Sequence, residues 1–186
     1  MLHYAPILPQ DYPVLTQIMT AAFDEDTRLH TSLLHDGPAG YNDGTLIRKL
    51  NENPDFISEK VLLDDKIIGA YTISHKPEQN ILELLFLDPD CGNQGLGTQI
   101  WNHIEEHFSN CSRWVLETPS YSTRNYHFYT KKCGFHFVCE KQYPDATSFV
   151  FEKERKSVLL SANGLPGAAK RKEVYTSCVC STFSGR

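Results

Sequence analysis

The sequence predicts an α+β fold in which helices flank one mixed, mostly antiparallel sheet. Apolar residues recur every three or four positions in some stretches, as in amphipathic helices, and alternate or run continuously in others, as in strands. These stretches do not follow one another as repeated strand–helix–strand units. A chain of 186 residues with 40% hydrophobic and 11% aromatic content can form one domain with a packed core.

The first expected elements are a short strand at 3–7 and two helices. Asp11 is suited to cap the first helix, because its carboxylate can accept a hydrogen bond from a free main-chain N–H. Apolar residues then recur at helical spacing over 15–23, and a second short helix is expected at 43–50. The polar, glycine-bearing segment 24–44 is expected to be loop in part.

Three strands should follow as an antiparallel meander. The first two, 56–63 and 66–74, are joined by a tight polar turn at Asp64 and Asp65. The third, 81–87, is apolar with one charged exception, which suits a central strand covered on both faces.

The remaining elements alternate before two final strands. A helix is expected from Gly95, because apolar residues recur every four positions after it. A strand at 114–118 and a helix at 122–133 come next, and Gly134 is placed to end that helix. The last strands are expected at 135–140 and 148–152.

The chain divides into a domain at 1–152 and a basic tail at 153–186. The tail is expected either to be flexible or to dock on a partner chain. It holds seven of the 18 Lys and Arg residues but two of the 23 Asp and Glu residues, so the domain is acidic. An acidic domain argues against nucleic-acid binding and favours cationic ligands such as amines, although ordinary surface charge explains the same excess.

Composition also excludes several classes of protein. No stretch approaches the ~20 apolar residues of a membrane span. The N-terminus lacks the charged-then-apolar layout of a signal peptide, so we expect a cytoplasmic protein without a membrane partner. The six cysteines do not have the paired spacing of a zinc site, and no metal is expected.

The segment LDPDCGNQGLGTQIW, residues 87–101, places three glycines between a strand and a helix. A nucleotide P-loop would need Lys-Ser/Thr after the last glycine, where this chain has Thr98-Gln99. A dinucleotide fingerprint has its glycine gaps in the opposite order, although Glu117 lies about where a ribose-binding acid would.

A third interpretation fits the order of elements best. The first turn of a helix has free main-chain N–H groups and a favourable dipole, so the amides of 93–98 are suited to bind a phosphate. Glycines at 95 and 97 would let the phosphate oxygens approach the backbone. A tight structural turn without a ligand is the alternative.

This segment, together with LETPSYSTRNYHFYTKKCGF at 116–135, resembles the Gcn5-related N-acetyltransferase (GNAT) superfamily. Its members have a central strand, a Pro-x-x-Arg/Gln-Gly-x-Gly-x-Gly/Ala turn and a helix, and later a tyrosine-bearing helix that ends in Gly-Phe. The resemblance covers about residues 3–152. It implies a three-layer fold whose sheet is splayed between its fourth and fifth strands.

The chain departs from the family pattern in three places. Gly92 stands where the family usually has Arg or Gln, and Asn93 replaces an often-glycine position. Ser122 stands where the family frequently has Asn, and Asn125 is the candidate substitute.

The resemblance implies an N-acetyltransferase that moves an acetyl group from acetyl-CoA to a primary amine of a small molecule or peptide, by direct transfer in a ternary complex. A non-catalytic acyl-CoA-binding module, acting as a sensor or protein partner, is the alternative. Dimers are frequent in the family, so a homodimer is expected. The implied cofactor-binding residues are Leu85, Phe86, Leu87, Gly92, Asn93, Gln94, Gly95, Leu96, Gly97, Thr98, Asn125 and Tyr129.

The catalytic candidates are Tyr129, Glu83 and Glu117. The resemblance assigns Tyr129 as the proton donor to the leaving thiolate, with a core tyrosine as the alternative. Glu83 is the single charge in an apolar strand, so we expect it in a cleft, where a raised pKa suits a general base. A structural salt bridge is its alternative. Glu117 is the rival base, and His75 and His127 are lesser proton carriers.

The acceptor amine is expected to be held by the first two helices and the loop between them. Asp24, Glu25 and Asp26 would form a cation-facing wall there. A solvated acidic loop is the alternative explanation of the same charges.

Overall fold

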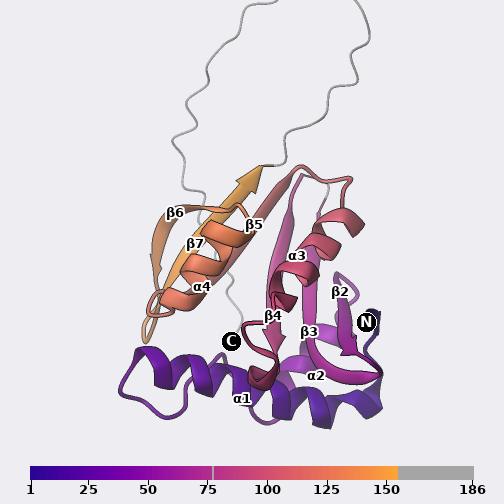
Figure 1. The fold of residues 1–186 in the computed structure, drawn as a ribbon. Helices are drawn as coiled ribbons and strands as arrows, with labels where there is room; N and C mark the ends of the chain where they lie inside the picture. The colour runs from indigo at the N-terminus through magenta and orange to yellow at the C-terminus, as the bar shows by residue number, and fades with distance from the viewer. Residues whose placement is uncertain (77, 155–186) are drawn as a thin grey trace, which may run out of the picture.

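The seven strands form a single sheet in the order β1-β2-β3-β4-β5-β7-β6 (Figure 1). The computed structural model describes residues 1–76 and 78–154. All neighbouring strands pair antiparallel except β4 and β5, which are parallel. The strands are β1 (Leu2–Pro6), β2 (Phe56–Leu63), β3 (Lys66–His75), β4 (Asn80–Leu87), β5 (Arg113–Pro119), β6 (His136–Gln142) and β7 (Thr147–Glu154).

The helices lie on both faces of this sheet, which confirms the predicted mixed, mostly antiparallel fold flanked by helices. In Figure 1, α3 and α4 lie on the face toward the viewer, and α1 runs beneath the sheet. The α-helices are α1 (Tyr12–His30), α2 (Thr45–Glu52), α3 (Leu96–His107) and α4 (Thr123–His127); the 3₁₀-helices are η1 (Pro9–Asp11) and η2 (Pro89–Cys91); and η3 (Phe128–Lys132) is a π-helix.

Each face of the sheet has its own apolar core. On one face, Leu15 and Met19 of α1 and Ile47 of α2 pack with Leu84 and Phe86 of β4. The other face is covered by α3, as its four-residue apolar repeat predicts. The largest fully buried side chains there include Trp101, Trp114, Tyr71, Phe151, Ile100 and Ile104.

Helix α1 is longer than its apolar spacing predicts. It continues through Asp24 and Asp26 to His30, whereas the sequence places the start of a partial loop at residue 24. Both carboxylates are buried and have hydrogen-bond partners, so tertiary contacts compensate for the low helix propensity of aspartate.

The tyrosine-bearing helix also differs from the prediction of one regular helix over 122–133. It begins with α4 and widens into the π-helix η3, in which the N–H of Cys133 donates to the carbonyl oxygen of Phe128. Such wide turns occur frequently at functional sites. Gly134 follows with a φ of 79°, in the left-handed region expected at a helix end.

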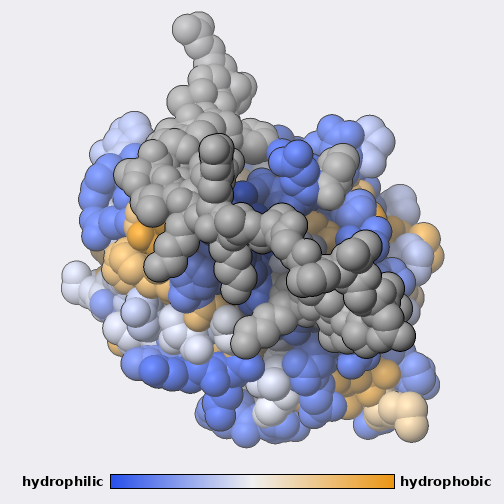
Figure 2. Space-filling model, turned by 90° about the horizontal axis from the view of Figure 1, so that it is seen from above, coloured by the Kyte–Doolittle hydropathy of each residue, from blue (hydrophilic) through white to orange (hydrophobic). Residues whose placement is uncertain are grey.

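The exposed large hydrophobic residues include Leu29, Leu33, Leu34, Phe137 and Val138. On the face seen in Figure 2, hydrophilic residues dominate the coloured surface and hydrophobic residues form separate small areas. None of the helices in 1–76 and 78–154 combines the length and the apolar character required to cross a membrane. The tail expected from residue 153 lies, from residue 155 onward, outside the described residues.

Candidate active site

Strands β4 and β5 separate after a short ladder, as the splayed-sheet prediction requires. Only residues 80–82 of β4 pair with β5, and their partners there are residues 114–116. Beyond that ladder β4 remains paired with β3 and β5 remains paired with β7. One edge of the last half of β4 is therefore without a strand partner and is open to a ligand.

A β-bulge in β4 marks the point where the strands part. Thr72 of β3 faces Leu84, but the next residue, Ile73, faces Leu82. Glu83 is therefore the extra residue of the bulge, and the alternation of side chains reverses there. As a result, Leu82 packs into the core under α3 and Leu84 packs into the core under α1.

A pocket of about 840 Å³ lies where the two strands diverge. Its walls come from α1, β4, the turn before α3, the end of β5, and α4 with η3. The pocket brings together the three catalytic candidates and all the implied cofactor-binding residues except Gln94, which does not line it. Those that do are Glu83, Leu85, Phe86, Leu87, Gly92, Asn93, Gly95, Leu96, Gly97, Thr98, Glu117, Asn125 and Tyr129.

The turn before α3 exposes main-chain N–H groups to this pocket. The first bond of the helix runs from the N–H of Gln99 to the carbonyl oxygen of Gly95. The N–H groups of Leu96, Gly97 and Thr98 therefore have no acceptor within the helix. Together with the positive end of the helix dipole, they form a site suited to an anion.

The two glycines of this turn are required for different reasons. Gly95 has a φ of 72°, so its role is to let the backbone enter the left-handed region before the helix. Gly97 lies against the segment that follows α4: a Cβ there would come within 3.2 Å of Cε2 of Phe128. The glycine at 97 thus permits close packing of α3 on the Phe128 ring, in addition to the predicted approach of phosphate oxygens to the backbone.

Gly95→Ala should lower the free energy of unfolding by about 1–2 kcal/mol, because alanine is strained in the left-handed region. A steric clash contributes nothing, since a Cβ at this position meets no atom within 4 Å. Urea denaturation measures the change. Gly95→Asn is the matched control, because asparagine tolerates this conformation and should recover much of the loss; equal losses in both variants would contradict this explanation.

Glu83 is half-buried at the bulge. None of the described residues donates a hydrogen bond to its carboxylate or forms an ion pair with it. Burial is the main reason that the pKa of its carboxyl is raised; Lys76 opposes the shift, and the negative charge of Glu117 adds to it. The structural salt bridge considered from the sequence is not present among the described residues.

Glu117, the rival base, is held in an ion pair. Its Oε1 accepts a hydrogen bond from Nζ of Lys141 at 2.8 Å, and its Oε2 accepts one from the hydroxyl of Tyr143 at 2.7 Å. The hydrogen bond between Lys141 and Glu117 is the main reason that the pKa of Lys141 is raised. A carboxylate with both oxygens occupied is poorly suited to take a proton from an incoming amine.

Tyr129 lines the pocket from η3 and is 8% exposed. Its ring lies among the rings of Phe128, Phe135 and Phe151, at centroid distances of 5.1, 5.8 and 6.2 Å. Burial is the main cause that raises the pKa of its phenol well above the ordinary value. The hydroxyl therefore keeps its proton near neutral pH and can donate it.

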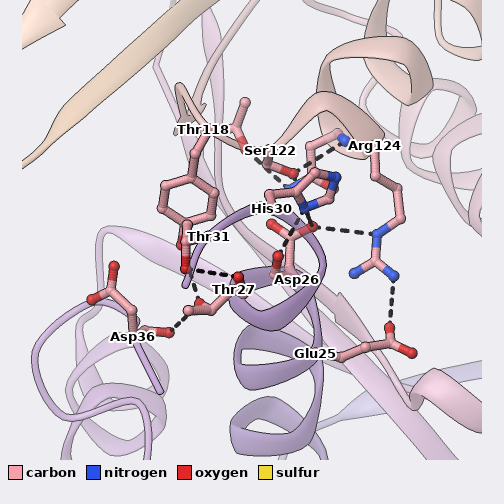
Figure 3. Close-up of polar contacts among 11 residues, drawn as sticks. Glu25, Asp26, Thr27, His30, Thr31, Asp36, Thr118, Ser122 and Arg124 are labelled. Atoms are coloured by element: carbon pink, nitrogen blue, oxygen red, sulfur yellow. Dashed lines mark hydrogen bonds and ion pairs between the residues drawn. The ribbon is translucent and has the colours of Figure 1, made fainter. Parts of the chain in front are cut away.

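The acidic residues of α1 do not form a uniform cation-facing wall, so that expectation needs correction. Asp24 does not line the pocket; its carboxylate accepts from the hydroxyl of Tyr41 at 2.8 Å and contacts His35. Glu25 and Asp26 do line the pocket, but both pair with the α4 side of it (Figure 3). Three aspartate or glutamate residues in succession on a helix must point in different directions.

Asn125, the candidate substitute for the family's asparagine, lines the pocket from α4. Its Nδ2 donates to Oγ1 of Thr118 at 3.1 Å, and its main-chain N–H donates to Oγ of Ser122. Ser122 itself is fully buried as the N-cap of α4, so the two residues have different positions and contacts.

Other residues depart from the sequence-based site. Neither His75 nor His127 is among the residues that line the pocket. Phe128, Lys132 and Arg124 do line it, and no sequence signal marked them in advance. Within 1–76 and 78–154, no group of three or more His, Cys, Asp or Glu side chains is placed to hold a metal ion.

Comparison with known proteins gives consistent matches. The model of the acetyltransferase (GNAT) family matches residues 18–135. The uncharacterized protein YrkN of Bacillus subtilis (strain 168) is 33% identical over 87 residues, which cover 46% of this chain and 47% of YrkN. The chain thus aligns with about half the length of this curated relative.

Solved structures share the fold at low sequence identity. An acetyltransferase from Thermus thermophilus has a TM-score of 0.66 and 18% identity, over 83% of this chain and 97% of that protein. The PaiA N-acetyltransferase of Thermoplasma acidophilum, solved with coenzyme A, has a TM-score of 0.63 and 15% identity, over 83% and 99%.

Proposed function

The chain belongs to the acetyltransferase (GNAT) family, and we propose that it transfers an acetyl group from acetyl-CoA to a primary amine of a small molecule or peptide. The two substrates react directly, in a ternary complex. One observation carries the proposal: a single pocket joins the free N–H groups of α3, the open edge of β4, Glu83 and Tyr129. When bound, acetyl-CoA supplies the activated thioester.

The start of α3 fits the diphosphate of this substrate. Main-chain N–H groups of 93–98 donate to the phosphate oxygens, and the helix dipole stabilises their charge. Because Gly92 replaces the arginine or glutamine of the family pattern, the backbone carries more of this binding. Lys132, which lines the pocket from η3, adds a positive charge to it.

The open edge of β4 fits the pantetheine arm. Residues 85–87 pair with β3 on one side only, so their outward main-chain groups bind the arm as an added strand. At the bulge, a freed main-chain N–H donates to the thioester oxygen as negative charge develops on it.

Glu83 and Tyr129 handle the two protons of the reaction. Glu83 removes a proton from the acceptor ammonium, directly or through one water molecule, so that nitrogen attacks the carbonyl carbon. The C–N bond forms and the C–S bond breaks. Tyr129 donates its proton to the departing sulfur and is reprotonated, by way of water, by the second proton that the nitrogen loses after its attack. Holding both substrates in one pocket supplies much of the rate.

Glu117→Gln should move the acidic limb of the kcat/KM profile to lower pH. The charge of Glu117 raises the pKa of Glu83, so its removal lowers that pKa. Lys141, released from its partner, acts in the same direction. A pH–rate profile measures the shift, with the exposed Glu140→Gln as control. If Glu117 were the base, the variant would instead lose activity at every pH.

A thiol-release assay tests the proposed function. Purified protein is mixed with acetyl-CoA and a panel of small primary amines and lysine-bearing peptides, and free coenzyme A is measured. Amine-dependent release, with acetylated amine in equal amount, is the expected result. Tight acetyl-CoA binding without release across the panel would instead favour a non-catalytic acyl-CoA-binding module.

A further inference from the structure

Beyond the β4–β5 ladder the sheet divides into two arms, one of β1 to β4 and one of β5, β7 and β6. Helix α1 connects these two arms. Its first turns pack on β4 through Leu15 and Met19, whereas its last turns contact the segment that leads from β5 into α4. Figure 3 shows two of these contacts, Nη1 of Arg124 to Glu25 at 2.6 Å and Oγ of Ser122 to Oδ1 of Asp26 at 3.0 Å. The hydroxyls of Thr27 and Tyr121 form a third, at 3.4 Å.

Asp26 is a buried residue of this connection with several polar partners. Its side chain is buried, with the residue 6% exposed, and lines the pocket. Besides the bond from Ser122, the same oxygen lies 3.4 Å from Nε of Arg124 and 3.2 Å from Nδ1 of His30. A buried carboxylate with several donors is held in one place, unlike an exposed ion pair.

The partner of Asp26 controls the start of α4. Ser122 is 0% exposed, and its hydroxyl oxygen also accepts the N–H of Asn125, which caps the helix. Asn125 in turn donates to Thr118 at the end of β5. Helix α4 continues without a break into the π-helix that carries Tyr129.

The separation of the two arms matters because no β4–β5 ladder fixes it beyond Leu82 and Leu116. Glu83 lies on one arm and Tyr129 on the other, and both must reach the same reacting group. We propose that Asp26 is a positioning residue: through Ser122 it holds the α4 arm at the distance from β4 at which Glu83 and Tyr129 act on one substrate. This inference rests on the proposed function.

Kinetics provide the first test. Asp26→Ala should lower kcat by about 10- to 100-fold, because a small displacement of a catalytic group is costly, while KM for acetyl-CoA changes less than about twofold. The effect should disappear in a Tyr129→Phe background, where no donor remains to be positioned. The inference is overturned if Asp26→Ala leaves kcat intact, or lowers it equally in that background.

The matched control is Asp11→Ala. Asp11 is a similarly buried carboxylate, 7% exposed, that pairs with Lys60 away from the pocket. The Asp11→Ala variant should have a lower melting temperature than the wild type but an unchanged kcat. Ser122→Ala removes the same Ser122–Asp26 hydrogen bond from the Ser122 side. If Asp26→Ala does not fold, the kcat of Ser122→Ala, alone and in the Tyr129→Phe background, decides the question.

A second readout needs no turnover. With 3-fluorotyrosine at position 129, the ¹⁹F resonance reports the surroundings of that ring. Asp26→Ala or Ser122→Ala should shift or broaden it, and Asp11→Ala should not. An unchanged resonance would refute the positioning role. If the variants shift the resonance but the protein transfers no acetyl group, the connection from Asp26 to Tyr129 is supported and the proposed function fails. Failure of the positioning role and failure of the proposed function therefore give different results.

Discussion

Tyr129→Phe is expected to lower kcat for acetyl transfer by about 10²- to 10⁴-fold, the usual contribution of a positioned proton donor. KM for acetyl-CoA should change little, because the ring still fills its place among Phe128, Phe135 and Phe151. Steady-state kinetics with a good acceptor amine measure both constants.

Tyr126→Phe is the matched control for this variant. Tyr126 lies on the same helix and packs against Phe151 at 5.5 Å, but it does not line the pocket. The kcat of Tyr126→Phe should stay within about twofold of the wild-type value, because a side chain that does not contact the reacting groups does not change the activation barrier of acetyl transfer. A Tyr129→Phe enzyme as fast as this control would remove Tyr129 from the mechanism.

Glu83→Gln should have the second-largest effect, a loss in kcat/KM of about 10²-fold or more near neutral pH. The acidic limb of the pH profile, set by the raised pKa of Glu83, should vanish with it. An unaltered profile in this variant would show that another group takes the proton from the amine.

The same substitution should stabilise the protein. Because burial raises the pKa of Glu83 in the folded state, folding stability falls as the pH rises from about 4.3, the value in an unfolded chain, through the raised pKa. Glu83→Gln removes this loss. Its melting temperature should exceed that of the wild type at pH 7 and match it well below pH 4; equal values at both pH values would contradict the burial of this charge.

Local patterns were sufficient to predict the order of elements. The four-residue repeat of Leu96, Ile100 and Ile104 predicts α3, and all three side chains are buried. The turn at 92–97 was predicted from its glycines, since backbone entering a helix in the left-handed region has few other solutions. The family resemblance added the splay between β4 and β5, which the end of the ladder at Leu82 confirms.

Long-range contacts account for what the sequence could not predict. Apart from Glu83, β4 is apolar at nearly every position, and such a run gives no period from which the register slip at its bulge could be detected. Glu83 and Glu117 are both single acids at strand positions. Glu83 is half-buried and Glu117 is exposed, and the partners of Glu117, Lys141 and Tyr143, lie on another part of the chain. The hydrogen bond between Asp26 and Ser122 joins residues that are 96 positions apart, so no local pattern could predict it.

The central claim is that the first N–H groups of α3 bind the diphosphate of coenzyme A, whose thiol arm lies beside β4. The most direct test is a ¹H–¹⁵N NMR titration of the full chain with coenzyme A. The account predicts that the largest amide shifts occur at 93–98 and 85–87, and that NAD at the same concentration leaves them unmoved. Unchanged amides at 93–98 with coenzyme A, or equal shifts with NAD, would contradict it.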